Sequence, residues 1–138
     1  MRAPADAPEI RTVVVEREMP FPASRIWRAL TQPELIAEWL LKSDFAPEVG
    51  RAFRFVQDWG EIECRVIEVE PETSLAYTWA AFGLESTVTW TLIPTGQGTR
   101  LRMEQTGFRR DQEEAYRGAR AAWTGYLRRL EAMLADAP

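Results

Sequence analysis

The chain has 138 residues, a length typical of one domain, and its formal net charge of −4 argues against a nucleic-acid partner. It contains no histidine and one cysteine, Cys64, so an internal disulfide and the usual zinc, copper and haem ligand sets are excluded. We therefore expect no metal and no cofactor. No apolar run approaches the roughly 18 residues of a membrane span, and residues 1–9 resemble neither a signal nor a transit peptide, which predicts a cytoplasmic protein with a disordered N-terminal tail.

The first predicted elements are a strand and two short helices. Residues 10–19 alternate as a strand does, and Arg17 shares its parity with the apolar residues of that strand. A helix is predicted at residues 23–30, and Thr31-Gln-Pro-Glu34 is a capping signal for a second helix that reaches about Trp39. Two short helices in succession form a connector that can close one end of a sheet.

From residue 43 onward the apolar period changes to two, which predicts a meander of strands. Turns such as Asp58-Trp-Gly60 separate neighbouring strands by only a few residues, and such short connections require antiparallel pairing. The apolar parity reverses at Ile67, which indicates either a bulge or a strand covered on both faces at that end. The predicted strands are residues 44–46, 51–56, 61–69, 75–80, 86–92 and 100–106.

The last predicted element is a helix at residues 111–135, and Asp111 with Glu114 fits a capping box at its start. About 25 residues at ~1.5 Å each make a rod of roughly 37 Å, and an apolar stripe of that length needs a broad partner such as a twisted antiparallel sheet. The stripe consists of Ala115, Ala119, Ala122, Trp123, Tyr126, Leu127, Leu130, Met133 and Leu134. The predicted fold class is α+β, with a curved sheet of about six or seven strands wrapped on this helix in a single domain, residues 10–135.

A series of short motifs runs through the same residues. They are Val14-Val-Glu-Arg-Glu-Met-Pro-Phe-Pro-Ala, Arg25-Ile-Trp-Arg-Ala-Leu-Thr-Gln-Pro-Glu-Leu, Glu38-Trp39, Gly50-Arg-Ala-Phe-Arg-Phe, Val66-Ile-Glu-Val-Glu-Pro, Leu75-Ala-Tyr-Thr-Trp79, Glu85-Ser-Thr-Val-Thr-Trp, Gly98-Thr-Arg-Leu-Arg-Met, Gly107-Phe108 and the helix at 118–134. In this order they resemble the activator of Hsp-90 ATPase homologue-like family of the START-like (SRPBCC, birch-pollen-allergen-like) superfamily. The resemblance implies the helix-grip fold, in which a curved antiparallel sheet grips a C-terminal helix with a cavity between them.

The resemblance also implies three functions. Superfamily relatives bind lipids, polyketides, plant hormones or other hydrophobic molecules in the cavity, so the first hypothesis is a small hydrophobic or amphipathic ligand. The family name comes from eukaryotic co-chaperones that carry this domain at the C-terminal end of a larger protein. The second hypothesis is therefore a chaperone-regulator type of interaction module connected with the stress response. Some relatives cyclise or hydrate their ligands, so the third is a cofactor-free enzyme acting on a polyketide-like or aromatic substrate.

Candidate ligand-binding residues lie on the inward parity of the predicted strands and on the helix stripe. A mostly apolar, aromatic wall with a few polar groups is what a small-molecule cavity needs. The alternative is that the same aromatic side chains fill a solid core. The candidates are Arg17, Phe55, Tyr77, Trp79, Trp90, Met103, Gln105, Trp123 and Leu127.

Arg17 has two possible roles. As an inward guanidinium it could hold a ligand carboxylate or phosphate through bidentate hydrogen bonds. Alternatively it lies near the strand end and pairs with a neighbouring glutamate or reaches solvent. An enclosed cavity of ~300 Å³ or more with Arg17 pointing into it favours a binder or an enzyme, whereas a packed interior with an exposed apolar patch favours an interaction module.

Catalysis has little support in the sequence. There is no histidine to act as a base, and Cys64 has no histidine partner to activate it, so no catalytic residue is assigned. Trp59, in a predicted hairpin turn, could gate the cavity, contact a partner or fold back on its own sheet. The oligomeric state is left open between a monomer and a homodimer.

Overall fold

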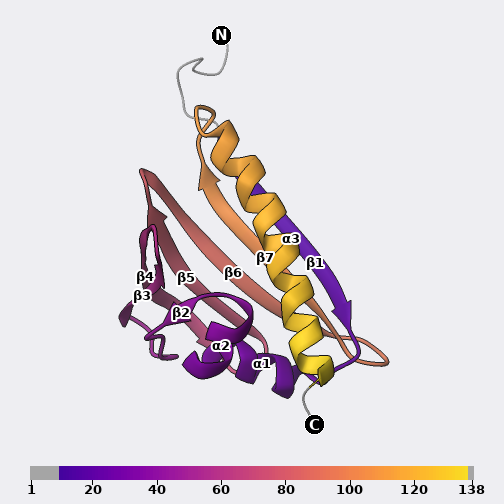
Figure 1. Ribbon diagram of the computed structural model, residues 1–138. Coiled ribbons are helices and arrows are strands. Elements are labelled where there is room, and N and C mark those ends of the chain that lie inside the picture. Colours follow the sequence, from indigo (N-terminus) through magenta and orange to yellow (C-terminus); the bar gives the residue numbers. More distant parts are fainter. Residues whose placement is uncertain (1–9, 137–138) are drawn as a thin grey trace.

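The computed structural model describes residues 10–136, so the tail predicted at residues 1–9 lies outside the described residues. Seven strands form one antiparallel sheet in the order β1-β7-β6-β5-β4-β3-β2, and a long C-terminal helix crosses one face of it over β1 and β7 (Figure 1). This is an α+β helix-grip arrangement, as the sequence predicts. The elements are β1 (Arg11–Met19), α1 (Ala23–Thr31), α2 (Pro33–Trp39), β2 (Lys42–Ser43), β3 (Ala52–Gln57), β4 (Gly60–Glu70), β5 (Ser74–Ala81), β6 (Leu84–Pro94), β7 (Thr99–Phe108) and α3 (Glu113–Asp136).

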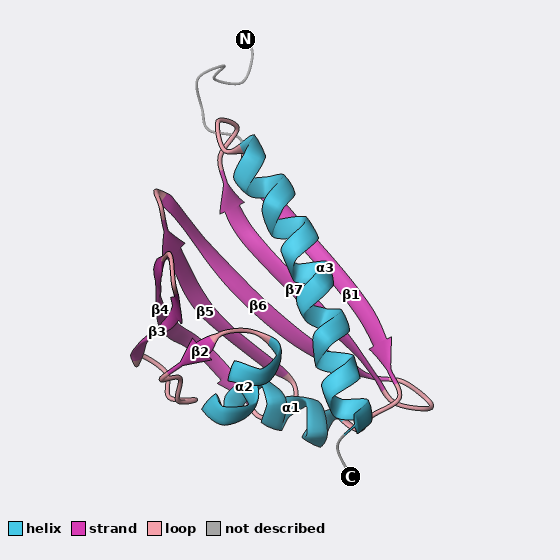
Figure 2. Cartoon of the chain, in the orientation of Figure 1, coloured by secondary structure: helices cyan, strands magenta, loops and turns pink. Residues whose placement is uncertain are grey.

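Different elements lie at the two ends of the sheet. The short helices α1 and α2 lie at one end, while the β5–β6 loop and the start of α3 lie at the other (Figure 2). Among residues 10–136, none of the three helices is long and apolar enough to cross a bilayer.

Alternation of side chains decides which face of the sheet becomes the core. In β6, Val88, Trp90 and Leu92 are buried against the helices, and the threonines between them are only partly covered. The predicted bulge is confirmed in β4, where the register with β5 shifts between Val66 and Glu68 and leaves Ile67 exposed. The sheet therefore presents one continuous apolar face to α3, α1 and α2.

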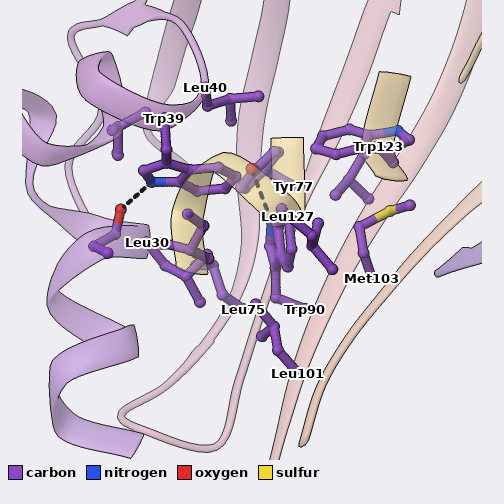
Figure 3. Packing of buried hydrophobic residues seen from close by; sticks show 14 of the residues in the cluster. Leu30, Trp39, Leu40, Leu75, Tyr77, Trp90, Leu101, Met103, Trp123 and Leu127 are labelled. Carbon is purple, nitrogen blue, oxygen red and sulfur yellow. Dashed lines mark hydrogen bonds between the residues drawn. The ribbon is translucent and has the colours of Figure 1, made fainter. Parts of the chain in front are cut away.

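Buried tryptophans within this core have their indole N–H groups satisfied. Trp39 Nε1 donates to the carbonyl oxygen of Ala29 at 2.9 Å, and Trp90 Nε1 donates to the hydroxyl of Tyr77 at 2.9 Å (Figure 3). A buried donor without a partner would cost about 1–3 kcal/mol. Because both N–H groups have an acceptor, the two indole rings can be buried in the apolar core without this cost.

Two predicted details differ from the structure. The short strand expected at 44–46 forms instead at Lys42–Ser43, because the Asp44 carboxylate accepts the backbone N–H of Arg54 at 2.9 Å where a ladder carbonyl would otherwise bind. The capping box of Asp111 and Glu114 does not form. α3 begins at Glu113, and the Asp111 carboxylate accepts from Arg109 Nε at 3.2 Å.

Candidate functional site: a groove beside the C-terminal helix

A hollow of about 690 Å³ lies between the first part of α3 and the end of the sheet that α1 and α2 do not cover, and it is partly open to solvent. We call it the groove. Its walls come from α3, from the β3–β4 and β5–β6 hairpins and from β7. The lining residues are Leu41, Trp59, Ile62, Trp79, Ala81, Phe82, Leu84, Gln105, Asp111, Gln112, Glu113, Glu114, Ala115, Gly118, Ala119, Ala122, Trp123 and Tyr126.

The groove exists because the side chains of α3 above it are small. Ala115, Gly118, Ala119 and Ala122 follow one another at helical spacing and all line the groove. A methyl group or a hydrogen atom cannot reach across to the sheet. We call residues 113–122 the groove half of α3; the buried face beyond them carries Trp123, Leu127, Leu130 and Leu134.

The floor of the groove holds one buried amide, that of Gln105, which is 1% exposed. Because an indole can only donate, Trp123 Nε1 fixes the amide orientation by donating to Gln105 Oε1 at 2.7 Å. Gln105 Nε2 then donates to Ser86 Oγ at 2.9 Å, and the Ser86 hydroxyl donates to the carbonyl oxygen of Trp79 at 2.9 Å. The chain of hydrogen bonds holds both tryptophan walls and leaves Gln105 one further N–H and one lone pair.

Aromatic rings form the walls and the mouth. The rings of Trp79 and Trp123 lie 5.1 Å apart at the floor, and those of Trp59 and Phe82 lie 5.2 Å apart at the mouth. Trp59 is 54% exposed and Phe82 is 79% exposed. Trp59 therefore packs against the neighbouring hairpin at the groove mouth, and Phe82 holds a left-handed backbone, φ 53°, that a non-glycine residue rarely adopts.

The nine candidate residues divide into three groups. Trp79, Gln105 and Trp123 line the groove. Arg17 lies outside it and forms an ion pair with Glu131 of α3, so the structure shows the alternative role and no inward guanidinium at the groove. The remaining candidates are 3% exposed or less and fill the core without lining the groove: Phe55, Tyr77, Trp90, Met103 and Leu127.

Several groove residues were not among those candidates. The residue before α3 is Gln112, which donates from Nε2 to the carbonyl oxygen of Gly83 at 3.2 Å and so joins the entry to the helix to the β5–β6 loop. Phe82 and the small residues of α3 also line the groove without having been singled out from the sequence. A run of alanine and glycine inside an otherwise bulky stripe was the available signal, because small side chains on a packed face leave room beside them.

The titratable groups of the core do not face the groove. Burial raises the pKa of the Cys64 thiol, with smaller contributions from the Asp44 and Glu63 charges, and burial likewise raises the pKa of the Tyr77 hydroxyl. Neither residue lines the groove, and residues 10–136 contain no group of three or more acidic or cysteine side chains that could hold a metal ion. The arrangement can enclose an apolar molecule and bond one polar group.

The chain was compared with known protein families and solved structures. Residues 20–135 match the family described as Activator of Hsp90 ATPase homolog 1-like protein. The chain belongs to this family. It is START-like in fold, which confirms the resemblance inferred from the sequence. No curated protein is significantly similar to this chain.

Solved structures of similar proteins share this fold. Protein MLL2253 from Mesorhizobium loti is 50% identical, with a TM-score of 0.90 over 93% of this chain and 99% of that one. DynU16, a protein in the dynemicin biosynthetic locus, is 26% identical with a TM-score of 0.83 over 91% of this chain, which spans 47% of DynU16. A Rhodobacter sphaeroides protein that is 24% identical, with a TM-score of 0.78 over 94% of this chain and 100% of that one, shows the fold alone.

Proposed function

We propose that this protein binds a small hydrophobic or amphipathic molecule in the groove. The observation that carries the proposal is the groove itself: about 690 Å³, walled mainly by aromatic and small apolar side chains, with one oriented amide on its floor. Ligand sites typically combine such walls with a small number of placed polar groups. Binding would bury the exposed faces of Trp59 and Phe82, which are otherwise in contact with water.

The surroundings support a binding role more than a catalytic one. The groove offers carboxylates at its edge and a neutral amide at its floor, and the buried thiol and phenol lie elsewhere. We therefore assign no catalytic residue and treat an enzyme acting on a polyketide-like or aromatic substrate as the weaker proposal. DynU16 is described as a protein of a biosynthetic locus, and that description supports small-molecule chemistry as a context for the fold.

A titration with N-phenyl-1-naphthylamine, an uncharged fluorescent probe, tests the proposal. Ala122→Trp would fill the groove from its exposed helix face, and Ala121→Trp is the matched control because Ala121 is exposed and does not line the groove. We expect probe affinity to fall at least ten-fold in Ala122→Trp and to stay unchanged in Ala121→Trp. Equal affinities in both variants would contradict binding in the groove.

A second candidate is a protein-interaction module that regulates a chaperone. The exposed Trp59 and Phe82 pair favours it, because adjacent exposed aromatic rings are typical of interaction surfaces, and the family description names an Hsp90 ATPase activator homologue. Line broadening of labelled protein on adding purified Hsp90, lost in Phe82→Ser, would support this module. Unchanged spectra at saturating chaperone would exclude it. A cytoplasmic location and a monomeric or homodimeric state remain predictions.

A further inference from the structure

The charged residues around the groove are unevenly distributed. Its lining includes three carboxylates, those of Asp111, Glu113 and Glu114, and no lysine or arginine among the described lining residues. All three lie at one end of the groove, where the chain enters α3. An anionic ligand would therefore meet like charges there without an opposing guanidinium or ammonium in the wall.

Neighbouring arginines pair with two of the three carboxylates at this acidic end. Glu113 pairs with Arg11 and with Arg117, and these arginines hold the pKa of its carboxyl below the usual value. Asp111 pairs with Arg109. Glu114 is exposed and has no ion-pair partner within residues 10–136. One carboxylate at the groove edge is thus available to a ligand.

The start of a long helix ordinarily attracts anions, because its free N–H groups and macrodipole carry partial positive charge. Here the first turn of α3 carries Glu113 and Glu114. Their carboxylates offset that partial charge. The helix start therefore gives no reason to expect a phosphate or carboxylate ligand in the groove.

The same end of α3 already holds one cation by this chemistry. The Arg11 guanidinium lies 3.9 Å from the ring centre of Tyr116 and pairs with the Glu113 carboxylate. An aromatic face and a carboxylate together stabilise a cation through the ring quadrupole and direct charge attraction. The groove repeats this combination with several rings and the carboxylate of Glu114.

We infer that the groove selects an aromatic cation, whose ring lies among Trp59, Trp79, Phe82 and Trp123 and whose ammonium group approaches Glu114. This inference rests on the proposed ligand-binding function and specifies the charge of the ligand. The apolar rings supply most of the contact area, and the acidic end decides between otherwise equal ligands.

Three naphthalenes that differ in charge test the inference by chemical-shift titration at pH 7 and low salt. They are 1-naphthylmethylamine as the cation, 1-naphthalenemethanol as the neutral compound and 1-naphthoate as the anion. We expect the cation to bind about five-fold tighter than the neutral compound, and the anion to bind more weakly than both. A cation no tighter than the neutral compound, or an anion as tight as it, would overturn the inference while leaving the binding function intact.

Other outcomes of the same titration would contradict ligand binding in the groove itself. If none of the three compounds shifts the resonances of Trp79, Gln105 and Trp123, then both the groove as a binding site and the inference are wrong. Binding that persists unchanged in Ala122→Trp would place the compounds elsewhere, with the same conclusion.

A charge variant tests the role assigned to Glu114. Glu114→Gln keeps the shape of an exposed side chain, so folding should be unaffected; Glu48→Gln, at an exposed position away from the groove, is the control. We expect Glu114→Gln to weaken binding of the cation about two-fold more than binding of the neutral compound, and Glu48→Gln to change neither. Equal losses for cation and neutral compound in Glu114→Gln would show a structural effect and contradict the inference.

Discussion

The two halves of α3 share one helical geometry and lie in opposite environments. In the groove half, residues 113–122, none of the side chains is buried. In the following residues 123–136, which we call the core half, Trp123, Leu127, Leu130 and Leu134 are each 5% exposed or less. The core half therefore buries large side chains, whereas the side chains of the groove half stay partly or fully exposed.

The difference shows how one amphipathic helix can both seal a core and border an open groove. The core half makes the hydrophobic contacts that stabilise the helix. The groove half is held by contacts at its start instead: the Arg11 and Glu113 ion pair, the bond from Gln112 to Gly83, and the rings of Phe108 and Tyr116 at 5.6 Å. A groove is left where the side chains between these two attachments are small.

The largest expected effect is in the core half. Leu130 is fully buried, so Leu130→Ala should lower the free energy of unfolding by about 2–5 kcal/mol because it removes apolar contacts and leaves a cavity. Ala122→Ser in the groove half should change it by less than about 0.5 kcal/mol. Urea unfolding at pH 7 measures both values, and a comparable loss in the two variants would contradict the division of the helix.

Trp123, at the boundary of the two halves, should show an intermediate effect. Trp123→Phe removes the N–H that Gln105 Oε1 accepts and leaves that buried oxygen without its donor, at a cost of about 1–3 kcal/mol. Tyr126→Phe changes a partly exposed residue about one helical turn further along α3, and it should lower the free energy of unfolding much less. If both variants unfold at the same urea concentration, the hydrogen-bond chain at the groove floor contributes nothing to stability.

The buried Cys64 and Tyr77 should make the free energy of unfolding depend on pH. Burial raises the pKa of Cys64 and of Tyr77, so the folded protein keeps these protons at a pH where the unfolded chain releases them. The contribution of each group to the free energy of unfolding is complete while the pH is below the pKa of that group in the unfolded chain. It is lost as pH rises above that pKa, at up to about 1.4 kcal/mol per pH unit for each group, and for the thiol the loss begins near pH 8.5. Unfolding midpoints from pH 7 to 10 should fall less steeply in Cys64→Ala than in the natural sequence; identical slopes would show that the thiol is not sealed.

The smallest expected effect is a gain in stability from either half. An added Cβ at Gly118 or Gly125 would meet nothing within 4 Å, so Gly118→Ala and Gly125→Ala should each raise the free energy of unfolding by about 0.5–1 kcal/mol through helix propensity. Only Gly118 lines the groove, so only its variant should alter binding of N-phenyl-1-naphthylamine. A change in probe affinity in Gly125→Ala would mean that the groove extends beyond the lining described above.

Much of the fold could be predicted because its signals are local. Strict alternation at Val88, Trp90 and Leu92 predicts both a strand and its inward face, and the structure confirms both. The reversal at Ile67 predicts a bulge or a strand covered on both faces, and the register of β4 and β5 shows that it is a bulge. The errors concern places where a side chain competes with the backbone, as Asp44 does by binding the N–H of Arg54.

The candidate site was predicted only in part, because inward direction does not distinguish a core from a groove wall. Tyr77 and Trp79 share a parity on β5, yet Tyr77 is sealed beneath Trp90 and Trp79 borders open space. The rings of Phe45, Phe53 and Phe55 cover Tyr77, whereas Trp79 lies beside Trp123 of α3, and no local pattern records these contacts between distant segments. The acidic end of the groove likewise arises from Asp111 and Glu114 meeting strands far away in the sequence.

The order of the elements, their antiparallel pairing, the apolar face of each strand and the stripe along α3 could all be derived from the amino-acid sequence, because they follow from periods of two and 3.6 residues and from short turns. The pairing of Arg17 with Glu131 across 114 residues, and the position of the small α3 side chains opposite Trp79 and Gln105, became visible only in the folded domain. Ion pairing and the width of a groove depend on distances between elements, and those distances are set by the packing of the whole domain.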